Sequence, residues 1–398
     1  DATTLKTLST NNSDMITVKM AAASTAAADL NAIDLLTGMS INATVITELT
    51  GTSTAITTAL ASSGITTVTD HSLAVKVDSG TASVSEINTI NNDSATGEVT
   101  ATVISGAASV LKALTTTSTD AITMTVNAEA ASAATLAADL VSLNGNTNRV
   151  ITMTAVSSVI GSYADLLDVY VTNEAQYNGL GNEAVTITGS VTAVQADAIA
   201  DKTSGVVIAT ITADTASALN AALVDAGGQI NAYNLTISAG SVEATDLTSL
   251  DSKTSVVVNA AAVTAITGSA VQIAAAYAAN PTTGITGLGN ESVTITGTTV
   301  ATLEELKAIN NATSGTITLN AESISADYSG VVSDVKAAFA GITTQTGKIV
   351  LTDVSVSVTD VNTVAGVTSG EVTATVISGA ASVLKALTTT STDAITMT

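Results

Sequence analysis

The chain has 398 residues, of which 46% are hydrophobic, with no cysteine or tryptophan, one phenylalanine and six tyrosines. This composition supplies a large core of small aliphatic side chains, and it excludes disulfides, thiolate metal sites and a core centred on aromatic residues. Against 34 acidic residues stand 11 lysines and arginines, and the formal charge of −23 repels nucleic acids and anionic lipids. Since no run of about 18 apolar residues is present, we expect no nucleic acid partner and no membrane insertion of this segment.

Short strand-like cores recur along the whole chain. In chain order they are ITV at Ile16, a poorer one near Ile41, VTATV at Val99, ITMTV at Ile122, ITMTA at Ile151, VTITG at Val185, VIATI at Val207, LTISA at Leu235, VVVNA at Val256, VTITG at Val293, ITLNA at Ile317, IVLTD at Ile349, VTATV at Val372 and ITMT at Ile395. These cores indicate about 14 repeats.

Between the cores lie short stretches with helical spacing. TLEELKAI places Leu303, Leu306 and Ile309 on one face, and AASVLKAL includes Val110 on its apolar face. Turn segments such as NNATSG, TTTSTD and DKTSG then close the repeats. The tightest spacing between cores is 23 residues. One strand, one short helix and a return turn in that length predict an α/β fold, a right-handed β/α solenoid with one parallel sheet that runs continuously over residues 1–398.

The alternative is an all-β solenoid, in which the helical stretches would be further strands. Their alanine content favours the helix.

Two pairs of segments repeat almost without change. GEVTATVISGAASVLKALTTTSTDAITMT occupies both residues 97–125 and residues 370–398, and the related GLGNEAVTITG and GLGNESVTITG occupy residues 179–189 and 287–297. Because the second long copy stops within a strand core, we expect the chain to be a fragment of a longer repeat protein.

Few side chains offer catalytic chemistry. His71 is the only histidine, which excludes a histidine metal cluster, and Asp70, His71 and Ser72 are consecutive and cannot form a catalytic triad. The GLGNE stretches have the glycine spacing of a nucleotide loop, but each precedes a strand, so we interpret their glycines as tight turns with positive φ. We therefore expect no enzyme and no resident cofactor.

Calcium is the one ion for which the sequence offers ligands. Carboxylate oxygens recur at turns, and exported repeat proteins are commonly rigidified by Ca²⁺. Neither a glycine-rich nonapeptide repeat nor an EF-hand loop is present, and turns also favour aspartate for backbone reasons. The candidate ligands are Asp14, Asp93, Asp120 and Asp393.

Thr-x-Thr pairs mark the strand cores. Strand alternation places them opposite the apolar residues, so stacked repeats would align them in rows on one flat face. Such an interaction face fits self-association or ice binding, although threonine is also generally favoured on the outer side of strands. Its predicted members are Thr100, Thr102, Thr123, Thr125, Thr152, Thr154, Thr186, Thr188, Thr294, Thr296, Thr316 and Thr318.

The Thr-, Ala-, Val- and Asp-rich repeats, with their SGEVTATV and VTITG cores, resemble the repeat regions of giant secreted surface proteins of bacteria, particularly of cyanobacteria and other aquatic species. The resemblance covers the whole chain and implies a role in a surface layer, a matrix filament or an adhesin. We therefore predict an extracellular or cell-surface structural protein whose partner is itself. An adhesin stalk or an ice-binding module is the alternative, and binding of glycans or other surface components stays open.

Overall fold

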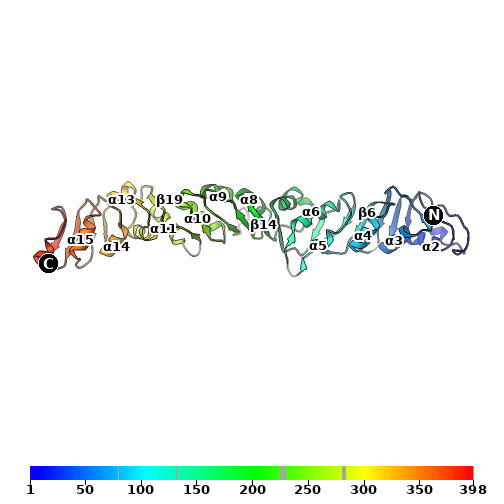
Figure 1. Cartoon of the computed structure of the whole chain (residues 1–398), viewed down its shortest axis with the longest axis horizontal. Coiled ribbons are helices and arrows are strands. Elements are labelled where there is room, and N and C mark those ends of the chain that lie inside the picture. Colours follow the sequence, from blue (N-terminus) through cyan, green and yellow to red (C-terminus); the bar gives the residue numbers. More distant parts are fainter. Residues whose placement is uncertain (79, 131–132, 225–229, 280–283, 398) are drawn as a thin grey trace. The chain divides into compact units, whose positions relative to one another are not determined.

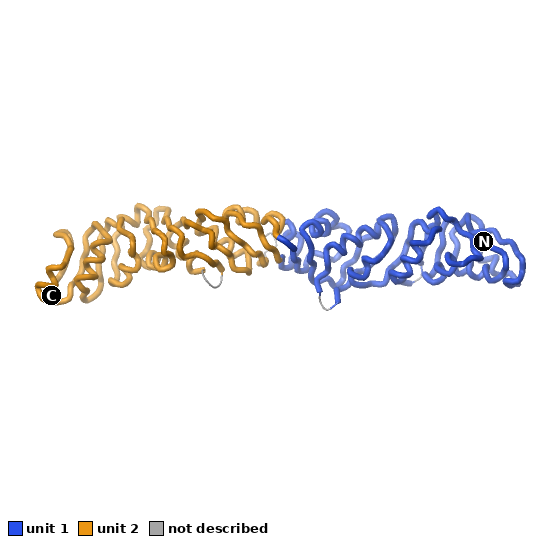
Figure 2. The backbone as a smooth tube through the Cα atoms, in the orientation of Figure 1, with its two compact units in different colours: residues 1–189, 198–207 blue, residues 190–197, 208–398 orange. Residues whose placement is uncertain are grey.

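Parallel strands alternate with short helices along the chain (Figure 1). The computed structural model describes residues 1–78, 80–130, 133–224, 230–279 and 284–397. They form two compact units, coloured separately in Figure 2: unit 1 comprises Asp1–Gly189 and Ala198–Val207, and unit 2 comprises Ser190–Asp197 and Ile208–Thr398.

Unit 1 is built from short elements. Its helices are α1 (Ala2–Leu5), α2 (Ala27–Asp34), α3 (Ser53–Ala61), α4 (Val84–Asn91), α5 (Ala108–Leu111), α6 (Ala137–Gly145) and α7 (Tyr163–Leu167), followed by the π-helix η2 (Asp168–Thr172) and the 3₁₀ turn η3 (Glu174–Gln176). Its strands are β1 (Ser24–Ala26), β2 (Ile41–Asn42), β3 (Glu48–Gly51), β4 (Ile65–Thr66), β5 (Leu73–Val77), β6 (Thr96–Thr102), β7 (Gly106–Ala107), β8 (Ala121–Thr123), β9 (Thr125–Asn127), β10 (Thr135–Leu136), β11 (Ile151–Met153), β12 (Ser158–Ser162), β13 (Tyr177–Asn178) and β14 (Ala184–Val191).

Unit 2 has the same kinds of element, and α8 (Ala193–Ala200) and β15 (Val207–Ile211), like β14, include residues of both units. The further helices are α9 (Ala216–Ala222), α10 (Ala244–Lys253), α11 (Ala270–Ala279), α12 (Leu303–Ala312), α13 (Ala321–Ser325), α14 (Val332–Ala338), α15 (Val358–Ala365) and α16 (Ala381–Leu384). The strands are β15 (Val207–Ile211), β16 (Ala232–Asn234), β17 (Gly240–Glu243), β18 (Val258–Asn259), β19 (Val263–Gly268), β20 (Ile285–Thr286), β21 (Ser292–Ile295), β22 (Ile317–Thr318), β23 (Tyr328–Gly330), β24 (Ile349–Leu351), β25 (Val372–Val376) and β26 (Ala394–Met397).

The chain folds as an α/β protein in which parallel β/α repeats form several all-parallel sheets. Each strand pairs with its counterpart one repeat away. The strand orders are β1-β3-β5-β6-β8 and β13-β11-β9-β7 in unit 1, and β17-β19-β21-β22 and β23-β24-β25-β26 in unit 2. The expectation of a single sheet is wrong, and so is the all-β alternative, because the alanine-rich stretches form helices such as α11.

The predicted core ITMTV shows why one sheet becomes several. The chain turns at Met124, so that Ala121–Thr123 pairs with β6 whereas Thr125–Asn127 pairs with β7 and β11. Many repeats also carry a second strand that lies outside the predicted cores, such as β3, β12 and β19. These strands are short and half-exposed, and they lack the regular alternation of apolar residues and threonine seen in cores such as VTATV and ITMTV.

Small aliphatic side chains fill the space between strands and helices. In β5, Leu73, Val75 and Val77 alternate inward, and in α12, Leu306 and Ile309 are fully buried. Burying one such side chain stabilises the fold by roughly 1.5–3 kcal/mol. The assignment of Val110 to the apolar face is wrong: α5 ends after Leu111, and Val110 is 59% exposed.

Helix starts are encoded locally. In α4 and α12 the side chains of the capping residues Ser83 and Thr302 accept hydrogen bonds from the backbone amides of Glu86 and Glu305. The carboxylates of these two glutamates in turn accept from the amides of the capping residues. An acidic residue in the first turn of a helix also forms an ion pair with a lysine of the helix before it. Lys336 of α14, for example, pairs with Asp360 of α15. Lys6 and Lys112, the C-cap residues of α1 and α5, pair in the same way with Asp29 and Asp139 in the next helix. Lys307 of α12 pairs with Asp334 of α14, past the intervening helix α13. No helix within the described residues is both long and apolar enough to cross a bilayer.

Candidate functional site

The twelve predicted threonines all lie at half-buried or exposed positions. They are divided among four sheets, and three of them lie just outside strands. Thr100, Thr102 and Thr123 belong to the sheet of β6 and β8; Thr125 and Thr152 to that of β9 and β11; Thr186 and Thr188 to β14; Thr294 and Thr318 to β21 and β22; and Thr154, Thr296 and Thr316 flank β11, β21 and β22. The twelve threonines therefore do not belong to a single sheet.

Strand register decides which threonines become neighbours. Thr102 lies opposite Thr123, and Thr125 opposite Thr152. Among the strand pairings of the described residues, the longest column has a member that the Thr-x-Thr pattern does not contain: Thr267 of β19 lies opposite Thr294, which lies opposite Thr318. The pairing of Thr294 with Thr318 offsets the two Thr-x-Thr pairs by two residues. Thr296 and Thr316, the other members of the two pairs, therefore do not lie opposite each other. We call Thr267, Thr294 and Thr318 the threonine column.

The four aspartates considered for calcium accept hydrogen bonds from backbone amides. Asp120 is 3% exposed; its Oδ1 accepts from the amide of Val99 at 2.8 Å and its Oδ2 from the amide of Thr117 at 2.7 Å. Asp393 repeats both bonds, Asp14 accepts from the Asn11 amide, and Asp93 from the Ala95 amide. These oxygens are aimed at positive N–H groups rather than at one another. Among the described residues, no three histidine, cysteine, aspartate or glutamate side chains gather closely enough to hold a metal ion.

His71 lies in an exposed turn with φ of 55°. Its Nδ1 is 3.1 Å from the carbonyl oxygen of Thr96, while the Ser72 hydroxyl donates to Asp70 at 2.5 Å. The three consecutive residues therefore make separate local contacts and do not form a relay.

The GLGNE turns adopt the predicted positive φ. Gly179 and Gly181 have φ of 102° and 116°, and Gly287 and Gly289 have 89° and 142°. A Cβ on Gly179 would come within 2.3 Å of the carbonyl oxygen of Met153 in the preceding repeat. The glycines thus allow the turn and a close approach of backbones.

The glutamate that follows each GLGN turn is buried, which the sequence did not reveal. Glu183 is 1% exposed; its Oε2 accepts from the amides of Gly181 at 2.9 Å and Asn182 at 3.1 Å, and its Oε1 accepts from the hydroxyl of Tyr170. Burial, and next the nearby carboxylate of Glu183, raise the pKa of Tyr170 above its usual value, so the phenol stays a donor.

Glu291 repeats this arrangement in unit 2. It is 1% exposed and accepts from the amides of Gly289 at 2.8 Å and Asn290 at 3.1 Å and from the hydroxyl of Tyr277. A signal was available, because each GLGNE glutamate has a tyrosine 13 or 14 residues before it. The two copies therefore share a buried carboxylate that closes the turn onto the preceding helical segment.

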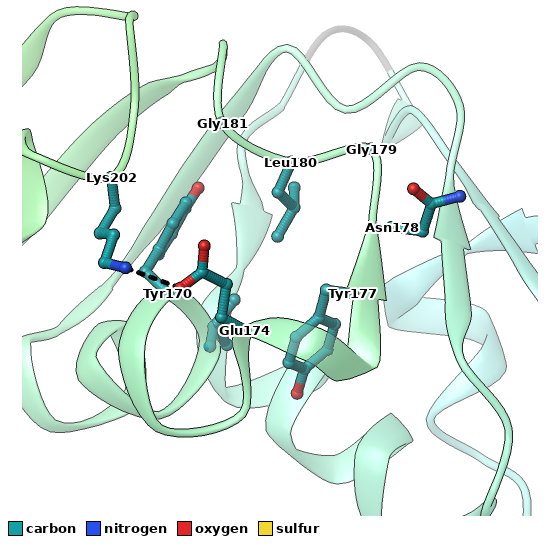
Figure 3. A pocket seen from close by; sticks show the side chains of 9 residues that line it. Tyr170, Glu174, Tyr177, Asn178, Gly179, Leu180, Gly181 and Lys202 are labelled. Atoms are coloured by element: carbon teal, nitrogen blue, oxygen red, sulfur yellow. Dashed lines mark hydrogen bonds and ion pairs between the residues drawn. The ribbon is translucent and has the colours of Figure 1, made fainter. Parts of the chain in front are cut away.

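Beside the first GLGNE turn lies a cavity of about 260 Å³, shown in Figure 3. Lys202 reaches across it to Glu174, with Nζ 2.6 Å from Oε2, and Leu180 points into it from the glycine turn. The lining residues are Val169, Tyr170, Glu174, Tyr177, Asn178, Gly179, Leu180, Gly181 and Lys202.

The cavity offers polar contacts but little reactive chemistry. Both tyrosine hydroxyls are engaged inside the fold, Tyr170 with Glu183 and Tyr177 with the Leu140 carbonyl oxygen at 3.1 Å. Burial also raises the pKa of Tyr177. Among the described lining residues there is no histidine, serine or cysteine to act as a base or nucleophile. In the first GLGNE copy, Lys202 stands immediately before the buried Thr203. The residue before the equivalent Thr313 in the second copy is Ala312, so the ion pair is not repeated there.

Compared with known proteins, the chain matches no protein-family model and has no significant sequence similarity to a curated protein.

Proposed function

We propose that this chain is a segment of an extracellular structural protein, a right-handed β/α solenoid of about 14 coils that assembles with copies of itself into a filament, layer or matrix fibre. The observation that carries the proposal is the repetition of the same contacts between successive repeats. A buried turn threonine bonds to the backbone of the preceding repeat in several described repeats, as in Thr203 to Glu183 and Thr313 to Glu291, both at 2.7 Å. Such bonds stabilise stacking and contribute no reactive group.

The composition supports the extracellular part of this proposal. Neutral polar side chains dominate the surface, cysteine is absent, and the sequence resembles the repeat regions of giant secreted bacterial surface proteins. The net charge of −23 also disfavours nucleic acid and anionic lipid as partners.

The threonine column supports self-association as the activity of the surface. Thr294 and Thr318 are exposed and lie on adjacent strands, which places their methyl and hydroxyl groups at the strand spacing of about 4.8 Å. A column of three threonines fits a local contact between two protein surfaces. It favours such a contact over ice binding, for which a broad two-dimensional array is needed.

The test compares the wild-type chain with a Thr294→Lys/Thr318→Lys variant by sedimentation velocity and electron cryo-microscopy. The matched control carries lysine at Thr359 and Thr363, which are exposed on α15. We expect the wild type and the control to form ordered assemblies and the column variant to lose side-by-side association while its circular dichroism stays unchanged. Assemblies that survive in the column variant would contradict the role of this surface, and a wild-type chain that stays monomeric would contradict the proposed function.

A further inference from the structure

The GLGNE turn occurs twice in the chain, and the two copies show which of its contacts the fold requires. Glu183 and Glu291 are equally buried, and each accepts hydrogen bonds from two amides of its own turn and from a tyrosine hydroxyl. Thr203 and Thr313 donate to the carbonyl oxygens of these glutamates, both at 2.7 Å. These shared contacts therefore suffice to close the turn and to join it to the next repeat.

The first GLGNE copy has features beyond the shared contacts. The π-helix η2 precedes its turn: the amide of Asn173 donates to the carbonyl oxygen of Asp168 at 2.8 Å, and the Asn173 side chain donates to the Asp168 carboxylate at 3.0 Å. Turns of π-helix are rare and are frequently found at functional sites. The 3₁₀ turn η3 follows and begins with Glu174, which lines the cavity shown in Figure 3.

The ion pair across this cavity is also specific to the first copy. Nζ of Lys202 lies 2.6 Å from Oε2 of Glu174. In the second copy Ala312 occupies the position of Lys202, and the segment between Tyr277 and Glu291 contains no acidic residue. Because the second turn closes without a lysine–glutamate pair, the pair in the first copy is available for a role other than closing the turn.

The pair retains hydrogen-bonding groups that the fold does not use. An ammonium group has three N–H donors, and among the described residues Lys202 directs them only to Glu174. Oε1 of Glu174 has no donor within the described part of the chain, and the Glu174 side chain is 61% exposed. The cavity thus presents a charged donor beside a charged acceptor, and both are accessible from solvent.

Apolar groups form the remaining walls of the cavity. Leu180 points into it from the glycine turn, as Figure 3 shows. The rings of Tyr170 and Tyr177 also line it, while their hydroxyls are engaged inside the fold. A ligand in the cavity therefore meets C–H and ring surfaces together with the Lys202–Glu174 pair. This combination of apolar walls and a few polar groups is typical of sites for small organic ligands.

We infer that the cavity lined by Leu180, Glu174 and Lys202 binds a neutral hexose unit. Of two adjacent hydroxyls on a sugar ring, one can accept from the Lys202 ammonium and the other can donate to the Glu174 carboxylate. The C–H groups of the ring then pack against Leu180. The inference adds a binding activity to the proposed structural function and does not depend on self-association.

Size and charge select this class of ligand. The cavity volume of about 260 Å³ lies just below the roughly 300–1,000 Å³ of pockets for drug-sized ligands, so it suits a single ring. The charges of Lys202 and Glu174 cancel each other within the site. The net charge of −23 on the chain repels anionic sugars, which favours a neutral hexose over a uronic acid.

The test titrates the full 398-residue chain with the methyl glycosides of glucose, galactose and mannose, and with methyl glucuronide as the anionic probe, by saturation-transfer NMR. At least one neutral glycoside should bind. Lys202→Ala introduces the residue present in the second GLGNE copy and should weaken that binding at least about tenfold. The matched control is Lys348→Ala, which removes the ammonium of the Lys348–Glu371 pair in unit 2 and should bind like the wild type. Circular dichroism verifies that the variants fold.

A second variant, Leu180→Trp, fills the cavity without changing either charge and should abolish binding. Undiminished binding in either variant would place the sugar elsewhere on the chain and overturn the inference. Failure of all three neutral glycosides to bind, or tighter binding of the glucuronide, would also overturn it.

A β-1,4-linked tetrasaccharide of the bound hexose identifies the source of the sugar: tighter binding than the methyl glycoside supports a polysaccharide ligand, and equal binding supports a single sugar residue. Sedimentation velocity should show the same assembly in Lys202→Ala as in the wild type. The hexose site and the proposed self-association therefore stand or fall separately.

Discussion

Thr147 and Ile122 are joined by a pair of hydrogen bonds between successive repeats: the Thr147 hydroxyl donates to the carbonyl oxygen of Ile122 at 2.7 Å and accepts from the amide of the same residue at 3.1 Å. One buried side chain thus satisfies both backbone groups of a strand residue, as a neighbouring strand would. The amide of Arg149 completes the arrangement by donating to the same hydroxyl at 3.0 Å. Buried threonines with a 2.7 Å bond of this kind also occur at Thr37, Thr203, Thr254, Thr313 and Thr368.

We predict that Thr147→Val destabilises unit 1 by about 1–3 kcal/mol, because valine keeps the shape but leaves buried amide and carbonyl groups unsatisfied. The midpoint of urea denaturation and amide hydrogen exchange at Ile122 measure the effect. Thr152→Val is the matched control: Thr152 is half-buried on the outer side of β11, and we expect a change within about 0.5 kcal/mol. Equal effects of the two substitutions would contradict a special role for the Thr147 hydroxyl.

A second prediction concerns the buried carboxylate of the GLGNE turn. Tyr277→Phe removes the hydroxyl that donates to Glu291, and we expect a loss of about 1.5–3 kcal/mol because the acceptor is a buried carboxylate. Tyr170→Phe should have a similar effect through Glu183 in unit 1. Thermal denaturation measures both variants. Tyr163→Phe, at a half-buried tyrosine that makes no hydrogen bond through its hydroxyl to a described residue, is the control and should leave the midpoint nearly unchanged.

The same tyrosines predict a loss of stability in alkali. Burial raises the pKa of Tyr277 above its usual 10.0. A raised folded-state pKa means that the unfolded chain ionises first, so this contribution is complete below about pH 10 and declines as the pH rises further towards the folded-state pKa. The free energy of unfolding should therefore fall more steeply above pH 10 in the wild type than in Tyr170→Phe/Tyr277→Phe. Parallel pH profiles would show that these phenols do not titrate on unfolding.

The sequence predicted the local elements better than their assembly. Alternation of apolar residues located strands such as β15, and helical spacing located Leu306 and Ile309 in α12, because both patterns are local. The division into several sheets depends on the turn at Met124 and on register between repeats, for which the sequence carries no local signal. Register likewise decided that the threonines align in short columns.

For the candidate site, the sequence revealed residue types but not their partners. The glycines of GLGNE imply their own positive φ, whereas the burial of Glu183 depends on Tyr170, brought to it by the π-helix η2. The buried threonines looked like ordinary turn residues in DKTSG and NNATSG, since only stacking places their hydroxyls against the preceding backbone.

The last prediction concerns the lysine–aspartate pairs that connect successive helices. The Nζ of Lys336 in α14 lies 2.8 Å from Oδ1 of Asp360 in the first turn of α15. The hydrogen bond from Lys336, followed by that from Ser357, holds the pKa of Asp360 below its usual 3.8. A lowered folded-state pKa contributes stability that is present above about pH 4 and is lost as the pH falls through the folded-state pKa.

Asp360→Asn should therefore lower the free energy of unfolding of unit 2 by about 0.3–1 kcal/mol at pH 7, a modest loss because both partners are partly exposed. The difference between the variant and the wild type should shrink as the pH is lowered from 5 to 2, since protonation of Asp360 removes the same interaction from the wild type. Salt should reduce the difference at pH 7 because mobile ions screen an exposed pair. Chemical denaturation at several pH values measures this, with Lys336→Met as the reciprocal variant. A difference that stays constant down to pH 2 would show that the Asp360 carboxylate contributes through packing rather than through its charge.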